Sequence, residues 1–180
     1  MKRIIATVLA VGVLVAAGIW FWSSRQTAER SQTVAEMEQL GGTVGVDAAS
    51  PGTPVTTLVL TGTAVTDADL DRLKELTQLQ ILSLNSTKIN DAGLERLKGL
   101  TQLTQLGLAR TEVTDAGLKN LKGLTQLTEL DLAGTRITDA GLECLNGLTE
   151  LRQLQLGNTK VSDAGVKKLQ QALPKCNVNR

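Results

Sequence analysis

Apolar residues recur along most of the chain with a fixed period of 24 residues. One period, residues 79–102, reads LQILSLNSTKINDAGLERLKGLTQ and holds Leu or Ile at seven positions. Across five periods, 34 of the 5 × 7 = 35 equivalent positions hold Leu, Ile or Val, and the exception is Ala172. A fixed period of this length indicates a solenoid, in which each unit buries its apolar face only against its neighbours.

The two halves of each period have different apolar spacing. The first half, LxxLxL from Leu79, alternates like a short strand that points Leu82 and Leu84 to one face. The second half, LxxLxxL from Leu94, has the spacing of a helix. We therefore expect each repeat to run as strand, turn, helix of roughly two turns, and loop.

Polar residues mark the boundaries of each predicted helix. Thr, Asn or Ser precedes an aspartate at the turn and supplies N-cap oxygens. The aspartates are Asp67, Asp91, Asp115, Asp139 and Asp163. After three of the helices a glycine stands where we expect a left-handed C-cap. These glycines are Gly99, Gly123 and Gly147.

The five aspartates have a structural and a metal-binding interpretation. An acid at a helix N-terminus accepts backbone N–H bonds and faces the positive end of the helix dipole. Stacking would also bring the carboxylates within roughly 5 Å of each other, so a calcium ladder is the alternative. Five helices with one aspartate each favour structural turn residues and no metal.

The pattern LxxLxLxxT-x-I/V-T-D-A-G-L-xx-L resembles the leucine-rich repeat, in the 24-residue TDAGL subtype of bacterial proteins, over about residues 55–180. It is also similar to the helical repeats of ribonuclease inhibitor and of F-box substrate adaptors. The resemblance implies an α/β leucine-rich-repeat solenoid, with a curved parallel sheet of five or slightly more strands inside and short helices outside. A threonine stands where many such repeats carry Asn or Cys, and we expect its hydroxyl to satisfy inner backbone groups. These threonines are Thr63, Thr87, Thr111, Thr135 and Thr159.

The chain begins with an apolar run, residues 4–22, preceded by Met-Lys-Arg. A helix of this length covers about 28 Å, close to the ~30 Å hydrocarbon core of a bilayer, and ends in the aromatic sequence Trp-Phe-Trp. We therefore expect residues 1–22 to be an uncleaved N-terminal transmembrane helix, with a cleaved signal peptide as the alternative. The positive-inside rule predicts a cytoplasmic N-terminus and extracytoplasmic repeats, in the periplasm or at the cell surface; cleavage would instead give a secreted protein.

The remaining segments are expected to close the two ends of the solenoid. Residues 23–54 are interpreted as a juxtamembrane linker and N-terminal cap, with a helix over 27–40 and a strand over 43–46. Residues 55–180 are the leucine-rich-repeat domain, made of five repeats and a C-terminal cap. In that cap, residues 173–178 resemble a truncated sixth strand that puts Val178 in the position of Leu154.

Composition argues against several classes of function. There is no His, so a Ser or Cys nucleophile would lack its usual imidazole base, and there is no Gly-rich phosphate loop. We expect no enzyme activity, no cofactor and no small-molecule substrate. After the anchor the chain carries 17 basic and 18 acidic residues and no aromatic residue, which argues against nucleic acid as a partner. Cys144 and Cys176 lie too far apart in the solenoid for a disulfide.

The candidate binding site is the concave face of the sheet, the recognition surface that the resemblance implies. Its side chains should be those that alternate with the core leucines. The predicted partner-binding residues are Ile81, Ser83, Asn85, Gln105, Glu129, Asp131, Gln153 and Gln155. This face is small and polar, with an acidic spot and no aromatic anchor, so we expect modest affinity.

We therefore expect a membrane-anchored, extracytoplasmic protein-binding module with an unidentified protein as its partner. A structural spacer, or a self-associating component of the cell envelope without a specific ligand, is the alternative.

Overall fold

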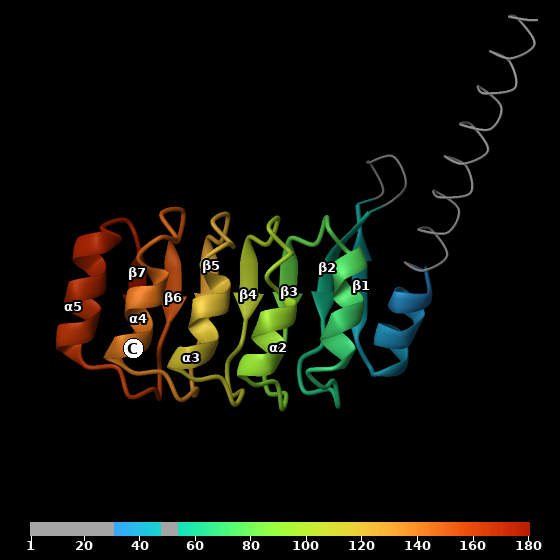
Figure 1. The fold of residues 1–180 in the computed structure, drawn as a ribbon, viewed down its shortest axis with the longest axis horizontal. Coiled ribbons are helices and arrows are strands. Elements are labelled where there is room, and N and C mark those ends of the chain that lie inside the picture. Colours follow the sequence, from blue (N-terminus) through green and yellow to red (C-terminus); the bar gives the residue numbers. More distant parts are fainter. Residues whose placement is uncertain (1–30, 48–53) are drawn as a thin grey trace, which may run out of the picture.

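The computed structural model describes residues 31–47 and 54–180, which form a row of strands with a row of helices along one side (Figure 1). Seven strands make one sheet in sequence order. Their bounds are β1 Thr43–Val46, β2 Val55–Val59, β3 Ile81–Ser83, β4 Gln105–Gly107, β5 Glu129–Asp131, β6 Gln153–Gln155 and β7 Asn177–Asn179. The strands from β2 to β7 are parallel, and β1 is antiparallel to β2. This arrangement confirms the predicted α/β solenoid.

The predicted transmembrane segment, residues 4–22, lies outside the described residues. Within residues 31–47 and 54–180, no helix is long and apolar enough to cross a bilayer.

The strand register repeats the sequence period. Leu82 pairs with Leu106, Leu106 with Leu130, Leu130 with Leu154, and Leu154 with Val178. Because each step is 24 residues, every side chain lies beside its equivalent in the next repeat. Val178 thus completes the series of strand leucines on β7.

The helices are short and vary along the stack. They are η1 Asp69–Glu75, α2 Asp91–Arg96, α3 Asp115–Leu118 with η2 Lys119–Leu121, α4 Asp139–Leu142 with η3 Glu143–Leu145, and α5 Asp163–Ala172. The side chains of Asn90, Thr114 and Thr138 accept hydrogen bonds from the backbone N–H two residues on, and Ser162 accepts one from Gly165. Thr66 does not cap its helix, which is a 3-10 helix that begins later; instead its N–H and hydroxyl both donate to Asp69.

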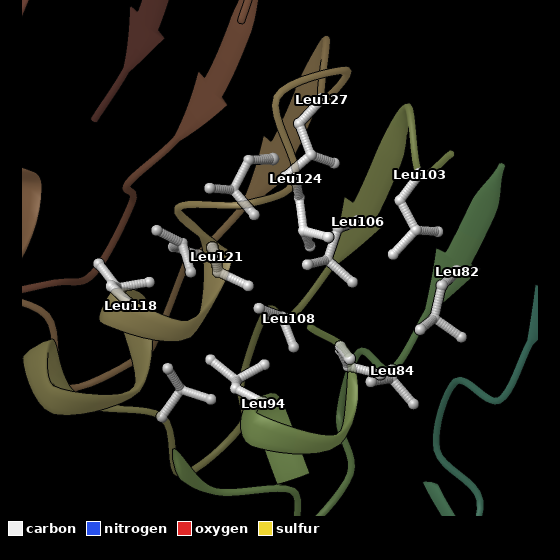
Figure 2. Close-up of a cluster of buried hydrophobic side chains, with 14 of the residues drawn as sticks. Leu82, Leu84, Leu94, Leu103, Leu106, Leu108, Leu118, Leu121, Leu124 and Leu127 are labelled. Atoms are coloured by element: carbon white, nitrogen blue, oxygen red, sulfur yellow. The ribbon is translucent and has the colours of Figure 1, made fainter. Parts of the chain in front are cut away.

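The core fills the space between the strands and the helices (Figure 2). Of the repeating Leu, Ile and Val positions, only Val166 is partly exposed, and the others are buried. Ala172 is exposed, and Leu173 is buried next to it at the end of the longer α5. Each buried Leu stabilises the fold by about 1.5–3 kcal/mol relative to an exposed one, so the leucine core accounts for the cohesion of the stack.

The threonines of the repeats close the loop after each strand. Each threonine hydroxyl donates to the carbonyl oxygen three residues earlier, at distances from 2.6 to 2.8 Å. Thr87, Thr111 and Thr135 are buried. The hydroxyls therefore satisfy inner carbonyl groups within their own repeat.

The left-handed position of each repeat follows the strand and not the helix, so the prediction for Gly99, Gly123 and Gly147 is wrong. Positive φ angles occur instead 24 residues apart, immediately before each threonine. They belong to Gly62, Ser86, Arg110, Gly134 and Asn158. In the first four the backbone N–H donates to a carbonyl of the next repeat at 2.7–2.8 Å, and this inter-repeat bond fixes the backbone conformation.

The N-terminal cap packs onto the first repeat. Residues 31–39 are helical, and Met37 in this helix is 1% exposed and belongs to the same core as the repeat leucines. Glu36 accepts a hydrogen bond from Gln32 and lies 2.5 Å from the guanidinium of Arg72 on η1. The cap is therefore held by both apolar contact and an ion pair.

Each turn aspartate is bonded by the repeat that follows it. The backbone N–H and hydroxyl of Thr114 donate to Asp91 at 2.8 and 2.6 Å. Thr138 makes the same pair of bonds to Asp115, and Ser162 makes them to Asp139. The aspartates are thus structural through contacts between repeats, and not through the backbone of their own helices.

This contact explains the glycine two residues after each aspartate. A Cβ on Gly93, Gly117, Gly141 or Gly165 would lie well inside 3.0 Å of the carboxylate of the preceding repeat. The first repeat has no aspartate of this series before it, and Asp69 takes the place of the glycine there. The glycine therefore makes room for the neighbouring carboxylate.

The left-handed positions generate a stability prediction. Gly62→Ala should lower the free energy of unfolding by about 1 kcal/mol, because Gly62 has φ +70° and its Cβ would meet no atom within 4 Å. Gly99→Ala is the matched control, since its Cβ also meets nothing but its φ is not left-handed. Urea unfolding of the full chain measures both, and an equal loss at Gly99 would contradict the assignment.

The contact between carboxylate and glycine generates a double-mutant cycle. Gly165→Ala should destabilise the chain by about 1–3 kcal/mol, because all three atoms nearest to its Cβ belong to Asp139. Adding Asp139→Ala should recover part of this loss, so the two changes should couple favourably in urea unfolding. Strictly additive losses would show that the two side chains do not share this space.

Candidate protein-binding face

The face of the sheet opposite the helices, called here the open sheet face, carries two rows of side chains. The first row runs through Ile81, Gln105, Glu129 and Gln153, and the second through Ser83, Gly107, Asp131 and Gln155. Each row takes one residue from each of four parallel strands, β3 to β6. Leucines at the intervening positions point to the core, so the alternation of the strands separates binding face from core.

The open sheet face is hollowed by a depression of about 260 Å³. Seven of the eight predicted binding residues line it, and so does Gly107. Gly107 lies between Ser83 and Asp131 in the second row. Because it has no side chain, it leaves a gap in that row.

Asn85 is the predicted binding residue that has a different role. It follows β3, and its side-chain oxygen accepts a hydrogen bond from the backbone N–H of Ala109 at 2.8 Å. A Cβ on Gly107 would lie 2.7 Å from the same oxygen. Asn85 therefore ties two repeats together and closes one end of the gap above Gly107.

The charges of the open sheet face have one sign. Glu129 and Asp131 are half-buried and lie on β5, two residues apart and on the same side. One oxygen of Asp131 accepts from the backbone N–H of Ala133 at 3.0 Å. Within the described residues neither carboxylate forms an ion pair. The cross-strand neighbours of Glu129 are Gln105 and Gln153, which are uncharged.

The helix side of the solenoid has paired charges instead. Arg96 lies 2.7 Å from Asp71 of the preceding repeat, and Lys168 lies 2.6 Å from Glu143 in the same way. The hydrogen bond and the charge of Lys168 hold the pKa of Glu143 below its usual value. These residues are exposed, so their pairs stabilise the chain only weakly.

The turn aspartates are occupied by the neighbouring repeat. Hydrogen bonds from the hydroxyl and then the backbone N–H of Ser162 lower the pKa of Asp139, and Arg180 lowers it further while burial opposes the shift. In the part of the chain that the structure describes, no group of three or more acidic, Cys or His residues is placed to hold a metal ion. The geometry of the aspartates is that of a link between repeats.

The two cysteines are free thiols at separate places. Cys144 lies in η3 and is partly exposed, and Cys176 is buried below β7. Burial raises the pKa of the Cys176 thiol, while Arg152 opposes the shift. Cys176 is a core residue of the C-terminal cap.

Family models for the leucine-rich repeat match two parts of the chain, a single repeat over residues 75–98 and a two-copy repeat over residues 125–168. No curated protein matches the sequence significantly. Among solved structures, an internalin (InlF) of Listeria monocytogenes is 27% identical with a TM-score of 0.60, over 69% of this chain and 34% of the internalin. The chain thus spans about a third of that protein.

A second solved structure shares the fold at lower identity. The leucine-rich-repeat ectodomain of the receptor kinase SOBIR1 from Arabidopsis thaliana is 17% identical with a TM-score of 0.57, over 84% of this chain and 91% of that one. The family models, the internalin and the solenoid together identify the chain as a leucine-rich repeat protein of the bacterial type. Domains of this kind typically mediate contacts between proteins through their extended sheet surface.

Proposed function

We propose that this protein is a membrane-anchored module that binds another protein with its open sheet face, outside the cytoplasm. The observation that carries the proposal is the depression on that face, lined by polar side chains that the fold does not use. Gln105, Gln153 and Gln155 make no side-chain hydrogen bond within the described residues, so their amides are available to a partner.

The surface chemistry supports a peptide or protein as the ligand. Amide and carboxylate groups spread over four strands match the dispersed donors and acceptors of a polypeptide. The absence of aromatic side chains from residues 31–47 and 54–180 removes the usual hot-spot anchors. Modest affinity follows, of the kind expected for a reversible contact.

The alternative is a spacer or a self-associating envelope component. One observation favours it: both edges of the sheet, β1 and β7, are strands without a further strand beside them in the described part of the chain. Such edges can pair with another copy. Cross-linking from the open sheet face separates the two functions, because a spacer leaves that face without a partner.

Photo-crosslinking in intact membranes tests the binding function. A photoreactive residue at Ser83 or Gln155 should capture one distinct protein, because both positions line the depression. The same probe at Lys122, which is exposed at the end of η2 on the helix side, is the matched control and should not capture it. Capture of only this chain itself, or equal capture from Lys122, would favour the spacer.

The anchor is tested by the intact mass of the protein purified from the membrane fraction. An uncleaved chain should retain residues 1–22, because the apolar run of residues 4–22 has the length of a bilayer span and continues through Trp-Phe-Trp beyond the small residues at 16–18. A mass that lacks residues 1–18 would show a cleaved signal peptide. Accessibility of Cys144 to a membrane-impermeant thiol reagent in intact cells should then report the side on which the repeats lie.

A further inference from the structure

The gap above Gly107 has walls of different chemistry. Ser83 and Ile81 stand on the β3 side, and Asp131 and Glu129 stand on the β5 side. Neighbouring strands lie about 4.8 Å apart, so the two walls are separated by about 10 Å with only backbone between Ser83 and Asp131. This width admits one extended side chain lying across Gly107.

The charge of the open sheet face selects the kind of side chain. Across the strands and the residues just beyond them, Glu129 and Asp131 are the charged positions in the described structure, and no Lys or Arg accompanies them. The nearby Arg152 is bonded to Glu150 and to the carbonyl of Thr149. The two carboxylates are therefore uncompensated, and a cation is their complement.

We propose that the gap above Gly107 receives a lysine or arginine side chain from a polypeptide segment, which Glu129 and Asp131 bind. The aliphatic stem lies against Ile81, since long basic side chains bury their methylene groups on apolar surface. The cationic head reaches the carboxylates of β5, where charge-assisted hydrogen bonds form. The amides of Gln153 and Gln155 on β6 then bond the backbone of the segment.

This inference rests on the proposed function and names the chemistry of its partner. A polypeptide is favoured over a free cation because the depression extends over four strands, beyond the reach of the two carboxylates. The glutamines beside them are neutral groups that suit peptide bonds and add nothing to the binding of a simple ion.

Fluorescence anisotropy with the full chain tests the proposal. The probe is a fluorescein-labelled peptide of alternating Ser and Arg, and its control carries citrulline, a neutral isostere, in place of Arg. The double variant Glu129→Gln/Asp131→Asn should bind the Arg peptide about tenfold more weakly at low salt, and the citrulline peptide should bind no better than that. Asp131→Asn keeps an oxygen that can accept from Ala133, so the local turn is retained.

A matched variant guards against general charge effects. Glu112→Gln removes one negative charge from an exposed loop position off the open sheet face and should leave binding unchanged. An equal loss in Glu112→Gln, equal binding of the citrulline peptide, or no loss in the double variant would overturn the proposal. Spermine that binds as tightly as the peptide, with the same dependence on Glu129 and Asp131, would make a free polyamine the occupant and also overturn it.

Cross-linking separates this inference from the proposed function. If a probe at Ser83 captures the same protein equally well in the wild type and in the double variant, the cationic contact is wrong and the binding function stands. If neither face captures a protein, the binding function itself fails. Loss of capture in the double variant alone supports both.

Discussion

The contact on which the stack depends is the carboxylate that each repeat extends to the next. Thr114 gives Asp91 both its backbone N–H and its hydroxyl, and so it spends its N-cap residue on holding its neighbour. That carboxylate needs space, and Gly117 provides it by having no side chain. A bond and a cavity for it thus recur together, and each interface between repeats is locked in the same register as the leucines. The exceptions fall at the ends: Asp69 replaces the glycine where no such carboxylate precedes, and Asp163, which has no repeat after it, pairs with Arg180.

Much of the fold could be predicted because its signals are short-range. The alternation around Leu82 and the helical spacing from Leu94 report the burial of neighbouring residues, and the 24-residue period carries that information to every repeat. The prediction of left-handed glycines failed for a related reason. Gly99 follows a helix, as a local capping rule requires, but the backbone is forced into the left-handed region at Arg110, where the N–H must reach Ala133 of the next repeat. A contact between repeats has no signature in the spacing within one.

The candidate site could be predicted to the same depth. Alternation along the strands shows which side chains leave the core, and it placed seven of the predicted residues around one depression. It could not show that Asn85 is bonded to Ala109, because that bond joins residues 24 apart. Nor could it give weight to Gly107, whose contribution is the space that it leaves between its neighbours.

The distribution of charge bears on whether the open sheet face serves only the stack. On the helix side, acids meet bases of the next repeat, as Arg96 meets Asp71. On the open sheet face, Glu129 has Gln105 and Gln153 as its cross-strand neighbours, although a lysine at either position would add a favourable cross-strand pair. Local choices that do not serve stability are expected where a surface serves a contact. A spacer gains nothing from two uncompensated carboxylates beside a gap, whereas a partner that brings a cation to them gains affinity and a fixed register along the strands.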